Sequence, residues 1–361
     1  MSDFSSHSLL SKEEYLQRLN QFEHEALIEG WADMPNLVQF SDEQVNLALP
    51  FYYQDLKADL QSWCDLQAQQ DARFPSTQVS VRVKPLQTPH GQAVKGVKNI
   101  IAVTSAKGGV GKSTTAVNLA LALQALGARV GLLDADIYGP SVPLMLGTQG
   151  EKPGVRDNKW MIPVEAHGLY TNSIGYLIAD QDAAIWRGPM ASKALAQILN
   201  ETLWPDLDYL VIDMPPGTGD IQLTLSQQVP VTAALVVTTP QDLALADARK
   251  GVTMFDQVEV PVLGIIENMS YHICSQCGHH EAIFGEGGAQ KMAQDANLTL
   301  LAQIPLHIDL RSDIDNGCPT VAARPDSEHS QTYLQLASHV AANLFWQGKA
   351  RTENIMFVDV S

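Results

Sequence analysis

Apolar and polar positions follow two different patterns along this chain of 361 residues. After Asn99, short apolar runs rich in β-branched residues alternate with longer amphipathic stretches. Continuous apolar runs are typical of buried parallel strands, and the stretches between them are typical of helices. The predicted strands are Ile100–Thr104, Val130–Leu133, Tyr209–Ile212, Ala234–Thr238, Val262–Ile266 and Leu298–Ala302, and the predicted helices include Ser113–Leu126 and Leu243–Phe255. The alternation predicts an α/β fold with a doubly wound, mostly parallel sheet that binds ligands at the carboxyl ends of its strands.

Residues 1–83 carry a different mixture of patterns. Ser11–Gly30 and Tyr53–Gln70 have helical periodicity, whereas Gln44–Leu49 and Gln78–Val83 alternate as strands do. We therefore expect a small N-terminal α+β domain over 1–83. Residues 84–98 contain two prolines and two glycines, which favours a linker. The predicted organisation continues with a larger domain over 99–347 and ends with a tail over 348–361.

The chain is strongly acidic, with a formal net charge of −17 and a pI of about 4.9. An excess of carboxylates opposes nonspecific binding to nucleic acid and to anionic membrane surfaces. No apolar run approaches the length of a membrane span, and the first residues are polar and acidic, unlike a signal peptide. These features predict a cytoplasmic protein with no nucleic-acid partner and no membrane partner.

Residues 99–114 read NIIAVTSAKGGVGKST and form the most informative local pattern in the chain. An apolar strand runs into a glycine-rich turn, in which backbone N–H groups can close around phosphate oxygens. Lys112 can reach the β- and γ-phosphates of a nucleotide, and the Ser113 hydroxyl can bind Mg²⁺. The following helix directs its N-terminus at the same anion. The predicted nucleotide-binding residues of this P-loop are Ala106, Lys107, Gly108, Gly109, Val110, Gly111, Lys112, Ser113 and Thr114.

Carboxylates follow two of the predicted strands. Asp134 and Asp136 come after one apolar run, and Asp213 ends another. A P-loop needs such groups to manage magnesium and water, and Asp213 has the position of a Walker B aspartate that holds Mg²⁺. Any one strand-end aspartate could instead cap a helix, but two such sets beside one P-loop favour chemistry. The segment 215–220, PPGTGD, is expected to be a switch loop that senses the γ-phosphate.

Cys274 and Cys277 form a C-x-x-C pair in a Gly- and His-rich insertion, and Cys64 and Cys318 are isolated. Two residues between thiolates allow both to face one metal ion. The pair could be half of a zinc site, a redox dithiol or half of an iron–sulfur site.

A four-ligand site needs two more ligands than this pair supplies. His279 and His280 lie so close to Cys277 that convergence on one ion would be strained. A redox pair would normally open a helix after a strand. A second copy of the chain would supply two further thiolates across a twofold axis. We therefore favour a cysteine site that is shared by a homodimer.

Taken together, these motifs resemble those of the Mrp/ApbC family of iron–sulfur cluster carriers, in the MinD/ParA/Mrp class of P-loop ATPases. The resemblance runs from about Gly96 to Gln347 and rests on TSAKGGVGKST, LLDADIYGPSVPLMLG, SIGYLIAD, WRGPMASKAL, VIDMPPGTGDIQLTLSQ, VVTTPQDLALADARKG, ENMSYHICSQCGHHEAIFGEGGA and IPLHIDLR. It implies slow hydrolysis of ATP with Mg²⁺ and a [4Fe–4S] cluster bound by Cys274 and Cys277 at a homodimer interface. It also implies a cluster-assembly scaffold and apo iron–sulfur proteins as partners.

The resemblance implies roles for further residues. The class carries an additional lysine in its loop, here Lys107, that reaches across the dimer to the partner's phosphates. Asp136 resembles the carboxylate that positions attacking water, and Asn268 has the position of an asparagine that reads the adenine edge. Segment 1–83 occupies the place of the family's small MIP18-like domain. The expected catalytic residues are Lys107, Lys112, Asp136 and Asp213.

Two other functions share part of this pattern. A spatial-regulation ATPase of the MinD/ParA kind would have the same loop and dimer, but its membrane-binding and DNA-binding versions carry basic helices or patches, and this sequence has neither. A zinc-bridged dimeric ATPase would use the same thiolates, because iron and zinc favour the same ligands. Metal analysis of anaerobically purified protein would separate iron from zinc.

Overall fold

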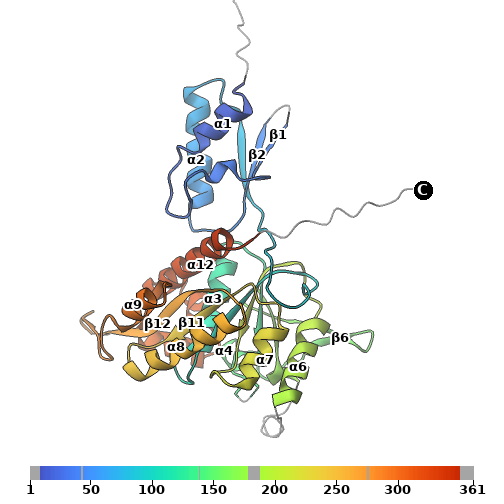
Figure 1. Cartoon of the computed structure of the whole chain (residues 1–361), viewed down its shortest axis with the longest axis vertical. Helices are drawn as coiled ribbons and strands as arrows, with labels where there is room; N and C mark the ends of the chain where they lie inside the picture. Colours follow the sequence, from blue (N-terminus) through green and yellow to red (C-terminus); the bar gives the residue numbers. More distant parts are fainter. Residues whose placement is uncertain (1–8, 42–43, 138, 178–187, 275, 350–361) are drawn as a thin grey trace, which may run out of the picture. The chain divides into compact units, whose positions relative to one another are not determined.

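The computed structural model describes residues 9–41, 44–137, 139–177, 188–274 and 276–349. The chain forms two compact units, residues 1–83 and residues 84–361 (Figure 1). Most of the predicted tail over 348–361 lies outside the described residues. Within the described ranges, no helix combines the length and the apolar character that crossing a bilayer requires.

The first unit packs helices against a small sheet. Its elements are α1 (Lys12–Leu19), η1 (Trp31–Asp33), β1 (Val38–Phe40), β2 (Val45–Leu49), α2 (Leu56–Gln70) and β3 (Thr77–Val81). β2 pairs antiparallel with β1 and parallel with β3. Alternate residues of β2 are buried, as are Leu56 and Leu60 of α2, so one face of the sheet and one face of the helix form the core.

The predicted helix over Ser11–Gly30 is wrong in its extent, because α1 ends at Leu19. The helix begins with a capping box between Ser11 and Glu14. It ends where the side chain of Asn20 bonds to a distant segment, accepting the N–H of Ala32 and donating to Asp33. The apolar residues after Leu19 therefore pack from irregular backbone and not from a continued helix.

The second unit is a doubly wound α/β structure. Its elements are β4 (Val97–Thr104), α3 (Lys112–Ala125), β5 (Val130–Asp134), α4 (Val142–Met145), β6 (Gly154–Arg156), β7 (Trp160–Ile162), β8 (Val164–Ala166), β9 (Leu169–Ser173), η2 (Ile174–Tyr176), α6 (Gly188–Glu201), β10 (Leu207–Asp213), α7 (Asp220–Gln228), β11 (Ala233–Thr238), α8 (Asp242–Gln257), β12 (Val262–Ile273), β13 (His280–Glu281), α9 (Gly288–Asp295), β14 (Thr299–Leu306), α10 (Ile308–Asp315), α11 (Thr320–Ala323) and α12 (Glu328–Gln347).

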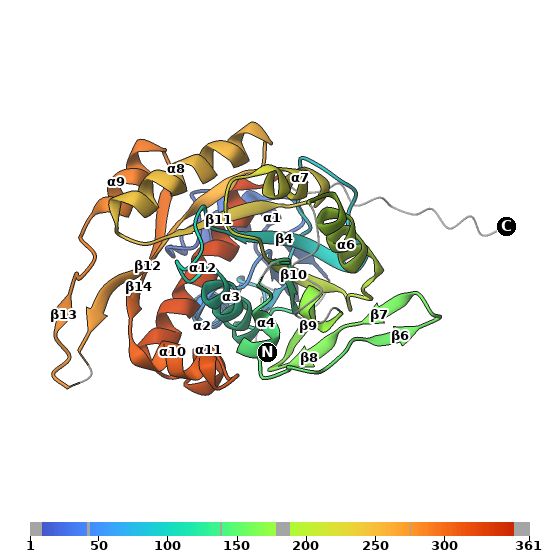
Figure 2. The same cartoon turned by 90° about the horizontal axis from the view of Figure 1, so that it is seen from below.

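The strands of its main sheet run in the order β13-β12-β11-β4-β10-β5-β9-β8, with β14 also paired to β12. Neighbours from β12 to β9 are parallel, and so are β12 and β14. Only the outer pairs β12–β13 and β8–β9 of this sheet are antiparallel in the described chain. Figure 2 shows α6, α7, α8 and α9 on one side of the sheet and α3, α10 and α11 on the other. The predicted α/β fold with a mostly parallel sheet is confirmed.

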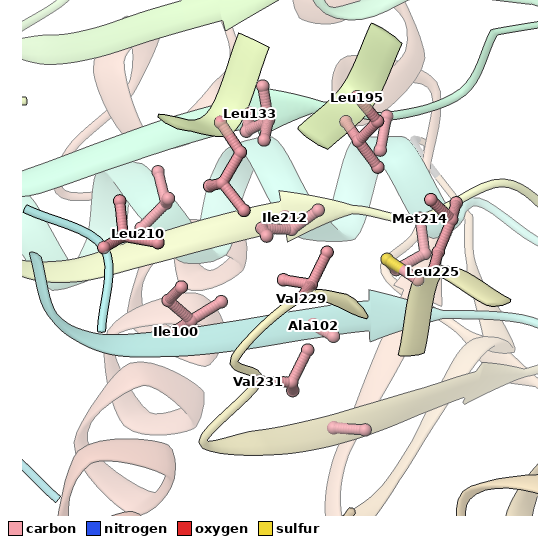
Figure 3. Close-up of a cluster of buried hydrophobic side chains, with 14 of the residues drawn as sticks. Ile100, Ala102, Leu133, Leu195, Leu210, Ile212, Met214, Leu225, Val229 and Val231 are labelled. Atoms are coloured by element: carbon pink, nitrogen blue, oxygen red, sulfur yellow. The ribbon is translucent and has the colours of Figure 1, made fainter. Parts of the chain in front are cut away.

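The core between the sheet and helices α6 and α7 follows the period-two rule for strands. Alternate residues of β4 and β10 meet Leu195 of α6 and Leu225 of α7 (Figure 3), and all are nearly inaccessible to solvent. This packing favours one register between the neighbouring central strands. Consequently Asp213 at the end of β10 lies in register with Asp134 of β5 and with Val103 of β4.

Residues 84–98, predicted as a linker, belong to the second unit. Leu86 and Val94 are buried, and the side chain of Asn99 accepts the N–H of Leu86 and donates to the carbonyl of Lys84. Prolines and glycines in this segment indicate irregular backbone, but irregular backbone can still be packed. The second domain therefore starts before the first strand, and β4 itself begins at Val97.

Candidate nucleotide site and cysteine hairpin

The loop of residues 105–111 connects β4 to α3 at the carboxyl end of the sheet. Gly109 and Gly111 have φ angles of +82° and +84°, which glycine adopts without strain. A Cβ at Gly108 or Gly109 would meet no heavy atom within 4 Å, so the loop is open on that side. Val110 is buried and anchors the loop, while Ala106 near its start and Thr114 in the first turn of α3 are half-buried. The geometry fits a phosphate group in front of the N-terminus of α3.

Lys112 lies at the centre of the predicted catalytic groups. Its Nζ is 2.5 Å from Oδ1 of Asp213, 3.2 Å from Oγ of Ser113 and 3.7 Å from Oδ2 of Asp136. The side chains of Lys112 and Asp213 are 6% and 0% exposed. A buried ammonium next to a buried carboxylate is stable only while both are present. The structure therefore brings together four of the residues that the sequence analysis selected, from helix α3, strand β10 and the loop after β5.

Asp134 has a different environment from Asp136. Its carboxylate accepts the N–H of Asp136 at 3.1 Å, the N–H of Val142 at 3.1 Å and the hydroxyl of Ser173 at 3.0 Å. Complete burial, together with the negative charge of Asp213, raises the pKa of Asp134 above its usual range. These bonds hold the loop between β5 and α4, so Asp134 shapes the segment that carries Asp136 towards Lys112.

One buried oxygen in this site has no partner among the described residues. Asp213 Oδ2 accepts no hydrogen bond, although its carboxylate is fully buried. A buried oxygen of this kind is unfavourable unless another group approaches it. Lys112 Nζ donates to both the Ser113 hydroxyl and the Asp213 carboxylate, so these two groups lie close together. Carboxylate and hydroxyl oxygens are ligands of Mg²⁺. The residues present therefore fit a magnesium ion beside Ser113 and Asp213.

The predicted switch loop contacts the beginning of the P-loop through its backbone. Gly217, with a φ of +110°, donates its N–H to the carbonyl of Ser105 at 2.8 Å. From α7, the Gln222 side chain donates to the hydroxyl of Thr104, the last residue of β4. Lys107 is exposed, and its carbonyl accepts the hydroxyl of Ser105 at 2.9 Å. Lys107 therefore does not join the group around Lys112 in this single chain.

Asn268 lies against the P-loop. Its Nδ2 donates to the carbonyl of Val110 at 2.8 Å, and a Cβ at Gly111 would lie only 2.0 Å from the same atom. This close approach explains why glycine is needed at position 111 in addition to its positive φ. The prediction that Asn268 reads the adenine edge stays a prediction, but its place beside the loop is clear.

The end of β12 and strand β13 form a projecting antiparallel hairpin (Figure 2). Cys274 and Cys277 lie between the paired residues of these two strands. The carbonyl of Cys274 accepts the N–H of Gly278, and the N–H of Cys274 donates to the carbonyl of His279. Backbone N–H groups of Gln276 and Cys277 lower the pKa of the Cys274 thiol, which favours the thiolate. Cys274 is half-buried and Cys277 is exposed. The tight turn holds both thiols at one end of a projecting arm.

One chain supplies an incomplete metal site at this tip. No group of three or more His, Cys, Asp and Glu side chains that could hold a metal ion occurs in the described part of the chain. His280 stacks on Tyr271 with ring centroids 5.0 Å apart and an angle of 17° between the planes. That ring therefore supports the hairpin.

Three polar residues at the site were missed by the sequence analysis. Ser173 binds Asp134, Gln222 binds the end of β4, and Glu267 is a buried carboxylate next to Asn268. Serine and glutamine are too common on helices and strand ends to give a signal of their own. Glu267 had one, because a charged residue inside an apolar strand is unusual and needs buried partners.

Comparison with known proteins agrees with these motifs. The sequence profile of the ParA family, described as "NUBPL iron-transfer P-loop NTPase", matches residues 96–341. The iron-sulfur cluster carrier protein of Escherichia coli K12 is 56% identical over 346 residues, which cover 94% of each chain. The iron-sulfur cluster transfer protein NUBPL of Mus musculus is 47% identical over 270 residues, which cover 74% of this chain and 83% of that protein.

Solved structures show the same likeness. A nucleotide-binding protein from Archaeoglobus fulgidus in complex with ADP has 36% sequence identity and a TM-score of 0.58, covering 66% of this chain and 93% of that chain. The cell division ATPase MinD of Pyrococcus furiosus has 22% identity and a TM-score of 0.52, covering 67% of this chain and 98% of that chain. The second likeness is one of fold alone.

Proposed function

The chain belongs to the NUBPL iron-transfer P-loop NTPase family, and we propose that it is an ATP-dependent carrier that binds a [4Fe–4S] cluster between two copies of itself and transfers the cluster to apo-proteins. The cluster is the cargo, and ATP is the substrate that the P-loop hydrolyses slowly.

The observation that carries this proposal is the cysteine hairpin. Two thiols, one with a lowered pKa, project at the tip of an arm that continues strand β12, and one chain offers them no further ligands among its described residues. A [4Fe–4S] cluster takes four thiolates. Two copies related by a twofold axis would supply four, and a cluster at such a seam is accessible to a recipient protein.

At the nucleotide site, each residue has a role in the proposal. The N–H groups of residues 108–111 bind the phosphates, and Lys112 moves from its pair with Asp213 towards the β- and γ-phosphates. Magnesium, held by Ser113 and Asp213, would neutralise phosphate charge when nucleotide is bound. Asp136 orients the attacking water, and Lys107 reaches the phosphates bound by the partner copy. Asn268 contacts the adenine edge.

The experiment is anaerobic reconstitution of the full chain with iron and sulfide, followed by metal analysis and an absorption spectrum. We expect wild type to gain iron and sulfide, together with the broad visible absorption of a thiolate-bound cluster. The double variant Cys274→Ala, Cys277→Ala should gain none. Cys318→Ala is the matched control and should load like wild type, because Cys318 lies outside the hairpin.

The same analysis tests the zinc-bridged alternative. If purified wild type contains zinc and does not exchange it for iron and sulfide, the proposed cargo is wrong. If the double cysteine variant retains the full iron content, the cysteine assignment is wrong.

A further inference from the structure

Strand β12 connects the two sites that the proposed function uses. It extends over Val262–Ile273, far beyond the apolar run Val262–Ile266 that the sequence predicts as a strand. Asn268 in its middle contacts the P-loop, and Cys274 follows its last residue. Cys274 is six positions after Asn268, a separation of at most roughly 20 Å along a strand. The same strand therefore has one contact at the nucleotide loop and one end at the cysteine pair.

The strand is interrupted between these two points. Its pairing with β14 already shifts by one residue between Ile265 and Ile266, and it runs without a break from Ile266 opposite Ala302 to Asn268 opposite Ile304. It then breaks off and resumes with His272 opposite Leu306. Three residues of β12 therefore stand against Pro305 alone, which has no N–H to donate to the sheet. Met269, the first of the three, has a φ of +55°, a left-handed conformation that is strained for a residue with a side chain. We call residues 269–271 the β12 bulge.

A buried hydrogen-bond network spans the bulge. The Oε2 atom of Glu267, just before it, accepts the Ser270 hydroxyl within the bulge and Nε2 of Gln303 on β14 at 2.8 Å. Gln303 Nε2 also donates to Ser270 Oγ at 3.0 Å. The other oxygen, Oε1, accepts the N–H of Ala289 in the first turn of α9 at 3.3 Å. Glu267 is only 1% exposed, so its carboxylate depends on these donors.

Asn268, the neighbour of Glu267 in β12, connects this hydrogen-bond network to the P-loop. Asn268 Nδ2 lies between the Val110 carbonyl and the α-carbon side of Gly111, with no space for a methyl group. A shift of the Val110–Gly111 backbone when phosphate binds must therefore move the Asn268 side chain. Because the strand is strained and unpaired just beyond Asn268, the bulge is where such a movement changes backbone direction.

We propose that the β12 bulge transmits the nucleotide state of the P-loop to the cysteine hairpin, and that Glu267 is the positioning residue that fixes the bulge in register. The inference rests on the proposed function in one respect, that the P-loop takes nucleotide and the cysteine hairpin takes the cargo. Glu267 and Met269 do not contact either ligand. They set the angle at which the hairpin presents Cys274 and Cys277. Coupling of this kind is reciprocal, so cargo also changes nucleotide affinity by the same factor.

The test uses the cluster-free full chain under reducing conditions. Alkylation of Cys274 and Cys277 by iodoacetamide is timed by peptide mass spectrometry, with and without saturating Mg²⁺–ADP. We expect ADP to change the rate for wild type by about fivefold or more, a typical allosteric factor. In Glu267→Gln and in Met269→Gly the factor should fall below about twofold, while the Kd for ADP stays within about twofold of wild type. Met269→Gly should still fold, because glycine adopts a positive φ without strain.

Two controls make the result specific. Glu281→Gln removes an exposed carboxylate from the same hairpin and should keep the wild-type factor. Repeating the assay at tenfold lower protein concentration separates this effect from dimerisation, which would make the factor depend on concentration.

Three outcomes would contradict the inference. The alkylation rate of wild type could be the same with and without ADP, the ADP factor could change with protein concentration, or the Glu267 and Met269 variants could keep the wild-type factor. Failed cluster reconstitution together with a retained ADP effect would contradict the proposed cargo and support the bulge. Absence of ADP binding would contradict both.

Discussion

The nucleotide site and the cysteine hairpin differ in how much of a working site one chain supplies. Around Lys112, one chain brings a buried cation, two carboxylates and a hydroxyl within hydrogen-bonding distance or close to it. At the hairpin tip it brings two thiols, one of them exposed, and no third metal-ligating side chain in the described part of the chain. A buried charge needs a partner within the same chain, because an unpaired buried charge is strongly destabilising. A thiol at the surface has no such cost, so its further ligands can come from a second molecule.

This difference predicts that damage to the two sites has different consequences. A change at Lys112 should affect both the chemistry and the stability of the fold. A change at the cysteine tip should affect only the cargo. Four variants test the contrast, from the largest expected effect to the smallest.

The largest effect is expected from Lys112→Ala. In the proposed mechanism the Lys112 ammonium faces the phosphates, so without it ATP hydrolysis should fall by at least about 100-fold. The buried carboxylate of Asp213 also loses its partner, so the free energy of unfolding should fall by about 3 kcal/mol. Hydrolysis of ATP and urea unfolding of the cluster-free protein measure the two effects. A variant with wild-type stability would show that Asp213 does not depend on Lys112.

The next largest effect is the complete loss of bound cluster that we expect from the double variant Cys274→Ala, Cys277→Ala, the matched case at the other site. Because the thiols lie at a projecting tip, the free energy of unfolding of the cluster-free protein should stay within about 0.5 kcal/mol of wild type. Urea unfolding under the same conditions as for Lys112→Ala gives the comparison. A loss as large as that of Lys112→Ala would mean that the hairpin is part of the core.

The pH dependence of the free energy of unfolding should report the electrostatic repulsion between Asp134 and Asp213. The pKa of Asp134 is raised in the folded protein from an ordinary value of 3.8, by burial and by the charge of Asp213. The folded chain therefore holds a proton that the unfolded chain releases, and this stabilising contribution is complete below about pH 4 and is lost as the pH rises through the raised pKa. Asp213→Asn removes one cause of the raised pKa, so the decrease in the free energy of unfolding with rising pH should be smaller by about 1 kcal/mol.

Urea unfolding of wild type and Asp213→Asn between about pH 5 and pH 8 measures the slopes. Parallel curves would show that the two carboxylates do not interact in the folded state.

Lys107→Ala should have the smallest effect on a single chain. Lys107 is exposed and its side chain does not join the Lys112 group, so the Kd for Mg²⁺–ADP should stay within about twofold of wild type. If Lys107 acts across the dimer, the variant should still lose the dependence of ATP hydrolysis on protein concentration. An unchanged concentration dependence would remove Lys107 from the proposed mechanism.

Much of the fold and of the nucleotide site could be predicted from local sequence. Short apolar runs such as Tyr209–Ile212 are typical of strands buried on both faces, and the glycines before Lys112 are typical of a phosphate-binding loop. The position of Asp213 next to Lys112 could be predicted because a residue at the end of a strand has a defined place in the sheet. These signals are local, since each depends on a few adjacent residues.

The features that were wrong or missed depend on contacts between distant segments. Residues 84–98 look like a linker until Leu86 is seen to be buried and Asn99 to be bonded to the segment. The second half of β12 is too polar to be predicted as a strand, because its partners on β13 and β14 determine its conformation. The role of Glu267 likewise requires Gln303 and Ala289, which are 36 and 22 residues away.

The most direct test of the shared cysteine site is the size of the species that carries the cluster. Reconstituted wild type is separated anaerobically by size, and iron and protein mass are measured across the elution profile. A cluster completed by two chains predicts that all bound iron elutes with the dimer, at about two iron atoms per chain, and that the monomer carries none. A monomer that retains iron and sulfide would contradict the account.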